Sequence, residues 1–155
     1  MTENEQAYLD MIAACEGTAG DYGYRALFGY TPSNNRVFDN GYATHPNIRV
    51  NFTDLNGNTN YSTAAGRYQI IFSTFKDLQA KLGTVDFSPQ TQDLMALQLI
   101  AEAGAGDAVR AGDLQTAIDT TAGIWASLPA SHYPQPKRTY DFALAAYNQA
   151  GGVAA

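Results

Sequence analysis

The sequence predicts an α+β fold in which a helical lobe is joined to a smaller, irregular lobe that carries short strands. Apolar residues recur at helical spacing near the start of the chain and again after residue 66, whereas the region 17–66 has no lasting helical period. That region instead holds seven of the 14 glycines and five of the ten tyrosines. The 155 residues show no linker and no internal repeat, so we predict one domain over residues 1–155.

Six helices are predicted from apolar stripes that are bounded by end signals. They cover residues 4–15, 67–82, 89–103, 106–111, 113–124 and 139–150. The first should be amphipathic, and Gly17 ends it. Gly83 suits a left-handed C-cap of the second. Ser88 before Pro89 places an N-cap residue ahead of a proline at the first helical position of the third.

Strands and loops are predicted between these helices. The alternating stretch 48–52 has the period of a strand, and Asn56-Gly57 between polar neighbours has the composition of a tight turn. The segment 127–138 holds three prolines and is predicted to be a loop.

Composition and charge exclude several classes of protein. The net charge is −6 and the arginines are scattered, so the basic stripe that a nucleic-acid partner requires is missing. No apolar run approaches the ~20 residues that span a bilayer, and the acidic N-terminus does not have the pattern of a secretory signal. The single cysteine cannot form an internal disulfide. We therefore expect a chain that is made in the cytosol, without stable membrane insertion.

Glu16 is the strongest candidate for a catalytic residue. It lies at the predicted C-terminal end of the first helix, after an apolar turn and directly before Gly17. The negative end of the helix dipole and the apolar neighbours both disfavour the carboxylate, so its pKa should be raised. A carboxylic acid that keeps its proton near neutral pH is what general-acid cleavage of a glycosidic bond requires. The alternative is a surface glutamate near a helix end.

Cys15, His45 and His132 suggest two other kinds of site, a thiol hydrolase and a zinc centre. Activated cysteines favour helix N-termini, whereas Cys15 falls in the last turn, where the dipole raises the thiol pKa. The three residues also lack the short spacing of zinc ligands. We expect Cys15 to pack as a small apolar residue, and we predict no metal and no cofactor.

Several tyrosines fall in predicted loops rather than in helix stripes. Beside amide side chains, such rings form a neutral surface that can stack on sugars and bond to their hydroxyls. These tyrosines are Tyr22, Tyr24, Tyr42, Tyr61 and Tyr133.

An ordered set of short strings covers most of residues 7–133 and resembles the phage lambda endolysin family of lytic transglycosylases. The strings are Ala7-Tyr8-Leu9-Asp10-Met11-Ile12-Ala13, Glu16-Gly17-Thr18, His45-Pro46, Ala65-Gly66-Arg67-Tyr68-Gln69-Ile70, Asp86-Phe87-Ser88-Pro89, Gln92-Asp93 and Ile124-Trp125-Ala126-Ser127-Leu128-Pro129. Their order and separations are those of the family, which is a stronger signal than any one short motif.

The resemblance implies a lysozyme-like fold, with the two lobes flanking a substrate cleft, and cleavage of the bond between N-acetylmuramic acid and N-acetylglucosamine in peptidoglycan. By analogy Glu16 is the single catalytic acid. Arg67, Tyr68 and Gln69 match the string that supports the glutamate and contacts the glycan, and Tyr133 matches a tyrosine that faces the sugar. The loops 46–64 and 127–138 would form two lips over the cleft.

One carboxyl group can suffice in such a reaction, because the C6 hydroxyl of the muramic acid acts as the nucleophile and a 1,6-anhydro ring results. A muramidase that hydrolyses the same bond needs a second carboxylate, and no aspartate in region 17–66 stands out for that role. A cysteine- or zinc-dependent amidase and a glycan-binding module of the virion are the other hypotheses.

Two parts of the chain depart from the family pattern. The segment 21–44 matches little, so its contacts are not assigned. The string Ala146-Tyr147-Asn148 is similar to a motif of bacterial transglycosylases, but the endolysin family does not keep it in this helix, and we expect Tyr147 to pack.

We also expect a monomer that accumulates in the host cytoplasm, because the N-terminus does not have the pattern of a secretory signal. It would reach the cell wall from the inside only after a separate protein opens the membrane. An enzyme with a net charge of −6 gains no attraction to an anionic wall, so its binding should tolerate moderate salt.

Overall fold

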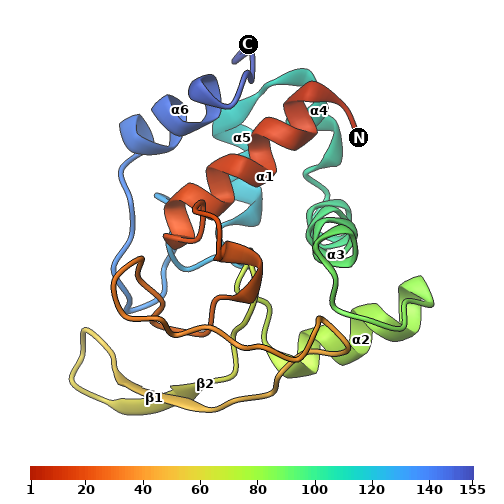
Figure 1. Cartoon of the computed structure of the whole chain (residues 1–155). Helices are drawn as coiled ribbons and strands as arrows, with labels where there is room; N and C mark the ends of the chain where they lie inside the picture. The colour runs from red at the N-terminus through yellow and green to blue at the C-terminus, as the bar shows by residue number, and fades with distance from the viewer. The chain divides into compact units, whose positions relative to one another are not determined.

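The computed structural model describes residues 1–155, which form six α-helices, one short 3-10 turn (Gly23–Arg25) and one two-stranded sheet. The residues divide into two compact units. The helical unit comprises Met1–Glu16 and Ala96–Ala155, and the strand-bearing unit comprises Gly17–Met95. Figure 1 labels the elements of both. None of the helices has the length and apolar character needed to cross a membrane.

The helical unit is built around α1 (Glu3–Glu16), which packs against α6 (Tyr140–Gln149) and α4 (Gly106–Ala111) (Figure 1). The helix is confirmed and the residues of its predicted apolar face are all buried, but the buried surface is wider than predicted, because Leu9 and Ala13 are buried as well. The buried residues are Ala7, Tyr8, Leu9, Met11, Ile12, Ala13 and Cys15. The phenol of Tyr8 shares a buried hydrogen bond of 2.8 Å with the hydroxyl of Thr121 in α5 (Leu114–Thr121). α1 is thus the central helix of its unit.

In the strand-bearing unit, β1 (Val50–Thr53) pairs antiparallel with β2 (Thr59–Ser62). The register places Val50 opposite Ser62 and Thr53 opposite Thr59. The turn is closed by Asp54, whose carboxylate accepts from two backbone N–H groups at 2.9 Å, and by Gly57 at a φ of +84°. The predicted turn is confirmed, and the predicted strand is confirmed except that it begins two residues later, at Val50.

α2 (Phe72–Leu82) ends as predicted at Gly83, which adopts a left-handed φ of +66°. Its predicted start at Arg67 is wrong. Ala65 and Ile70 exchange backbone hydrogen bonds of 3.0–3.1 Å across a tight turn, and Gln69 in that turn has a φ of +48°. A left-handed residue cannot continue a right-handed helix, so the helix begins only after the turn.

The remaining helices follow their predicted end signals. α3 (Pro89–Glu102) begins at the expected proline, α4 lies where it was predicted, and α6 follows Thr139, whose hydroxyl accepts from the N–H of Phe142 at 3.2 Å. α5 ends three residues early, because the N–H of Ile124 bonds to Thr121 in a tighter i to i−3 turn. The segment 127–138 contains no helix or strand, as predicted.

Candidate active site

Glu16 is the last residue of α1, and the chain turns directly after it at Gly17, whose φ is +77°. The carboxyl group accepts a hydrogen bond of 2.6 Å from the hydroxyl of Ser127, which comes from the loop 127–138 of the same unit. No lysine, arginine or histidine of residues 1–155 forms an ion pair with it. Ser127 is therefore a neutral partner beside a carboxyl group that is largely removed from water.

Burial raises the pKa of Glu16 from 4.5 to about 7, although the hydrogen bonds from Ser127 act in the opposite direction. The expected direction of the shift is confirmed, and desolvation by burial is its largest cause. A carboxyl group with this pKa is partly protonated at neutral pH and can both donate and accept a proton there.

The loop that supplies Ser127 is fixed by its own backbone contacts. The carbonyl of Ser127 accepts from the N–H of Arg138 at 2.8 Å, and the ammonium of Lys137 donates to the carbonyl of Ser131 at 2.6 Å. Tyr133 on this loop is 46% exposed, while its hydroxyl donates to the carbonyl of Gly123 at 2.7 Å. Its ring is therefore held in place with a face open to solvent, which is what stacking on a sugar requires.

In the strand-bearing unit, the turn Gly66–Gln69 is tied to α3 by the buried amide of Gln92. The amide oxygen accepts from the N–H of Arg67 at 2.9 Å, and the amide nitrogen donates to the carbonyls of Tyr24 and Phe87, both at 2.9 Å. Gly66 has a φ of +79°, and a Cβ there would lie 2.2 Å from the same amide oxygen. Only glycine satisfies both conditions at this position.

Arg67 is positioned by two phenols and a carboxylate. The hydroxyl of Tyr68 accepts from the Arg67 guanidinium at 3.0 Å and donates to Asp93 at 2.6 Å. Tyr24 donates to the same oxygen of Asp93 at 2.9 Å, and the guanidinium lies over both tyrosine rings at 5.3 and 5.6 Å. Burial raises the pKa of Tyr68, so its hydroxyl keeps its proton. Tyr68 is fully buried, and it can assist binding only through Arg67.

Gln69 stabilises the same turn through a hydrogen bond from its own side chain. Its side-chain amide donates to the carbonyl of Gly66 at 2.9 Å, and its own backbone takes the left-handed conformation. Of the five residues predicted for the site, Glu16 and Tyr133 belong to the helical unit, and the string 67–69 belongs to the strand-bearing unit.

Comparison with known proteins decides the family. A sequence profile described as Endolysin matches residues 6–154. The chain belongs to the endolysin family. It is 36% identical to the endolysin of Escherichia phage P2, over 99% of this chain and 96% of that protein. It is 37% identical to the endolysin of Escherichia phage lambda, over 99% of this chain and 94% of that protein.

Solved structures of the lysozyme from bacteriophage lambda share the fold of this endolysin. One of them, in complex with a chitohexasaccharide, superposes with a TM-score of 0.87 at 35% identity, covering 100% of this chain and 98% of that one. Another gives a TM-score of 0.84 at 34% identity, with the same coverage. The predicted lysozyme-like α+β fold and the resemblance to the lambda endolysin family are both confirmed.

The geometry of this endolysin does not favour a cysteine nucleophile. Cys15 is buried with its sulfur 3.7 Å from that of Met11, and burial raises the pKa of the thiol to about 12. His45 is enclosed by the rings of Phe72, Phe75 and Phe87. One ring nitrogen of His45 donates to the carbonyl of Ile70 at 2.7 Å and the other accepts from the N–H of Asn47 at 3.0 Å, which leaves neither free to act as a base.

The same residues do not assemble a metal centre either. Within residues 1–155, no three His, Cys, Asp or Glu side chains come together in a group that could hold a metal ion. His132 is exposed, and the thiol of Cys15 would have to lose a tightly held proton before it could bind zinc.

Three residues of the site were not assigned a role from the sequence. Ser127, Gln92 and Asp93 all lie in strings that carry the family resemblance, so the signal was present in their position. Their roles depend on partners that are distant in the sequence. Ser127 lies 111 residues from Glu16, Gln92 lies 25 residues from Arg67, and Asp93 lies 69 residues from Tyr24. Sequence spacing does not predict hydrogen bonds of that range.

Proposed function

We propose that this endolysin is a lytic transglycosylase that cleaves the β-1,4 bond between N-acetylmuramic acid and N-acetylglucosamine in peptidoglycan. Glu16 is its single catalytic residue. The observation that carries the proposal is the carboxyl of Glu16, with a pKa raised to about 7, one hydroxyl partner and no ion pair. Such a group can serve first as an acid and then as a base at one pH.

The reaction balances without water. The protonated Glu16 donates its proton to the glycosidic oxygen, which leaves with the N-acetylglucosamine as the bond to C1 breaks. The resulting carboxylate then removes the proton from the C6 hydroxyl of the muramic acid, and O6 bonds to C1. The product carries a 1,6-anhydro ring and Glu16 regains its proton. Because the nucleophile belongs to the same sugar, it is already held close to C1.

Ser127 has a role in the middle of this sequence. Its hydroxyl donates to the Glu16 carboxyl, and a donor stabilises the carboxylate more than the neutral acid. The hydrogen bond therefore supports the anion that exists between the two proton transfers, and it keeps the pKa from rising further.

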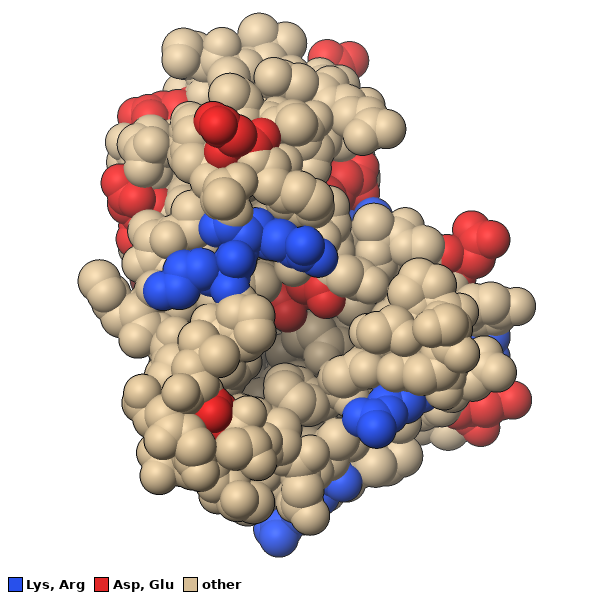
Figure 2. All heavy atoms as spheres, turned by 90° about the vertical axis from the view of Figure 1, so that its left-hand side faces the viewer, with Lys and Arg blue, Asp and Glu red and all other residues tan.

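The glycan is bound by Arg67 with Tyr68 behind it, by Gln69 and by the exposed ring of Tyr133. The structure of the bacteriophage lambda lysozyme has been solved with a chitohexasaccharide. That complex supports a glycan ligand for the endolysin described here. The face drawn in Figure 2 is made mostly of uncharged residues. A mostly neutral surface suits sugars, which are recognised by hydroxyl bonding and ring stacking.

Product analysis tests the reaction class. Purified murein is digested with the protein, and the glycan ends are identified by mass spectrometry beside a digest made with a hydrolytic muramidase. Muramic ends that are one water lighter than the hydrolytic ends are expected. Reducing muramic ends would instead make the protein a muramidase, and release of peptides with intact glycan would make it an amidase.

The proposal includes the route to the substrate. The protein is a monomer that accumulates in the host cytoplasm and reaches the wall after a separate protein opens the membrane. Bacteria that produce the chain in the cytosol should stay intact until their membrane is permeabilised, and should then lyse within minutes. Lysis without permeabilisation would contradict this part of the proposal.

A further inference from the structure

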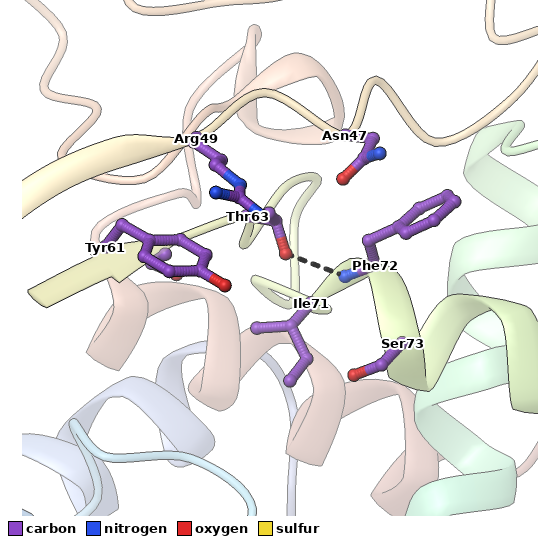
Figure 3. Close-up of a pocket in the computed structure, with 8 residues that line it drawn as sticks. Asn47, Arg49, Tyr61, Thr63, Ile71, Phe72 and Ser73 are labelled. Carbon is purple, nitrogen blue, oxygen red and sulfur yellow. Dashed lines mark hydrogen bonds between the residues drawn. The ribbon is translucent and has the colours of Figure 1, made fainter.

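A pocket lies wholly within the strand-bearing unit, between the β1–β2 hairpin and the start of α2 (Figure 3). Its volume is about 560 Å³, which is in the range of small-ligand sites. The pocket is lined by Asn47, Arg49, Tyr61, Ser62, Thr63, Ile71, Phe72 and Ser73. The lining does not include Glu16, Arg67, Tyr68, Gln69 or Tyr133, but it does include Tyr61, one of the loop tyrosines expected to stack on sugars.

Arg49 gives the pocket its charge. The guanidinium lies 4.3 Å from the centre of the Tyr61 ring, and Figure 3 shows the two side chains together on one side of the pocket. No aspartate or glutamate lines the pocket, and Arg49 forms no ion pair with any residue of the chain. A cation that is held over an aromatic ring without a counter-ion attracts an anion.

The other walls offer hydrogen-bond donors. The side-chain amide of Asn47 and the hydroxyl of Ser73 have no partner within the protein. The hydroxyl oxygen of Thr63 accepts from the N–H of Phe72 at 3.0 Å, so the proton of that hydroxyl is still available. The first turn of α2 adds the positive end of a helix dipole. Ile71 and Phe72 provide apolar surface below and beside these groups (Figure 3).

We propose that this pocket binds a carboxylate of the peptide stem of peptidoglycan. The inference rests on the proposed function, because it takes the wall polymer as the substrate. The glycan of that polymer offers neutral rings and amides, and its carboxylates belong to the amino acids of the stem. The apolar surface fits the methyl groups of alanine, and the donors around Arg49 fit the two oxygens of a carboxylate.

Chain connectivity links the pocket to the glycan-binding residues. Ser62 and Thr63 line the pocket, and Arg67 follows four residues after Thr63 in the same segment. A strand bound by Arg67 and Gln69 would carry its stem close to this segment. The overall charge of −6 repels an anionic stem, so a local cation is needed to hold it.

Binding of a soluble stem tetrapeptide tests the pocket without turnover. The peptide is titrated into the full ¹⁵N-labelled chain, and backbone amide shifts are followed. We expect shifts centred on Thr63, Phe72 and Ser73, with affinity that weakens about ten-fold or more in Arg49→Gln. Arg49→Lys should restore part of the affinity because it keeps the charge.

Two controls identify what is recognised. Lys76→Gln removes one exposed positive charge from α2 outside the pocket, and it should leave the peptide affinity unchanged. The same peptide with its carboxyls amidated should bind about ten-fold or more weakly. Loss of affinity in Lys76→Gln equal to that in Arg49→Gln would reduce the effect to net charge and overturn the proposal.

Other outcomes would also overturn the pocket assignment. They are the absence of shifts, equal binding of the amidated peptide, and displacement of the peptide by inorganic phosphate at equal concentration, which would indicate a general anion site. Because the titration does not depend on bond cleavage, these outcomes leave the transglycosylase proposal standing. Reducing muramic ends in the murein digest would overturn the transglycosylase proposal, but they would not change the result of the peptide titration.

Discussion

The two units shift the pKa of a carboxyl group in opposite directions. In the helical unit, burial raises the pKa of Glu16 to about 7, and one serine hydroxyl is its partner. In the strand-bearing unit, Asp86 accepts hydrogen bonds from the hydroxyls of Thr91 and Ser88 and from the N–H of Ser88. These bonds, with that from Thr91 as the largest cause, lower the pKa of Asp86.

Asp86 and Glu16 illustrate how a structural carboxylate can be distinguished from a reactive one. Asp86 is surrounded by donors because its carboxylate accepts from the N–H and hydroxyl of Ser88 and from the hydroxyl of Thr91. It thereby holds Ser88, whose own hydroxyl accepts from the N–H of Thr91 and caps the start of α3. Glu16 has too few donors to compensate for its burial, and the cost appears as a tightly held proton. A carboxyl with an uncompensated desolvation penalty is a candidate for proton transfer, whereas one with several local donors is a candidate for stability.

The largest expected effect is the loss of catalysis in Glu16→Gln. Glutamine keeps the oxygen that accepts from Ser127 but has no proton to transfer, so murein cleavage should fall by roughly 10²–10⁴-fold. The rate is measured as release of soluble fragments, with a sedimentation assay for murein binding as the control. Unchanged cleavage would refute the assignment of Glu16, and absence of cleavage in the wild type with retained binding would indicate a binding module.

The same substitution should change stability in a pH-dependent way. Because the pKa of Glu16 is raised from 4.5 to about 7, the native state binds this proton more tightly than the unfolded chain does. The free energy of unfolding should therefore fall as the pH rises between these values, by roughly 3 kcal/mol. With glutamine at position 16, which does not titrate, this fall in the free energy of unfolding should be absent.

The pH dependence of the free energy of unfolding is measured by urea unfolding of the wild type and of Glu16→Gln. Glu16→Gln should be more stable than the wild type at about pH 8 and about equal to it at about pH 4. Stability that is lower than the wild type at both values would show that Glu16 has no uncompensated burial.

Asp86→Asn should have the opposite signature and a smaller size. The depressed pKa of Asp86 means that its charge stabilises the fold above the ordinary pKa of 3.8, and that this stability is lost as the pH falls through the native pKa. We expect a cost of about 1 kcal/mol at neutral pH and none in strong acid. The measurement is the urea midpoint at each pH, and an equal cost at both would contradict a charge-dependent role.

The smallest expected effect is that of Ser127→Ala. The hydrogen bond from Ser127 lowers the pKa of Glu16, so its loss should raise that pKa further. The activity of the wild type should decline above about pH 7 as Glu16 loses its proton. In the variant this alkaline limb should move to higher pH by less than about one unit, with a lower maximum. A limb that does not move would separate Ser127 from the titration of Glu16.

Local signals in the sequence determined most element ends. Gly83, Pro89 and Thr139 act through their own backbone or side chain, so the boundaries that they set could be predicted without the fold. The start of α2 could not, because the turn before it depends on a pairing between Ala65 and Ile70 and on the buried amide of Gln92. Apolar spacing alone does not distinguish such a turn from a helix.

The order of the helices, the endolysin family and the position of Glu16 at the end of an apolar helix could all be predicted from local patterns. The chemistry of that carboxyl could not, because its partner Ser127 lies 111 residues away and its burial depends on packing. The same holds for the unpaired Arg49, whose lack of a counter-ion follows from which side chains surround it. Periodicity and caps are local properties, whereas desolvation and charge pairing are set by neighbours that only folding brings together.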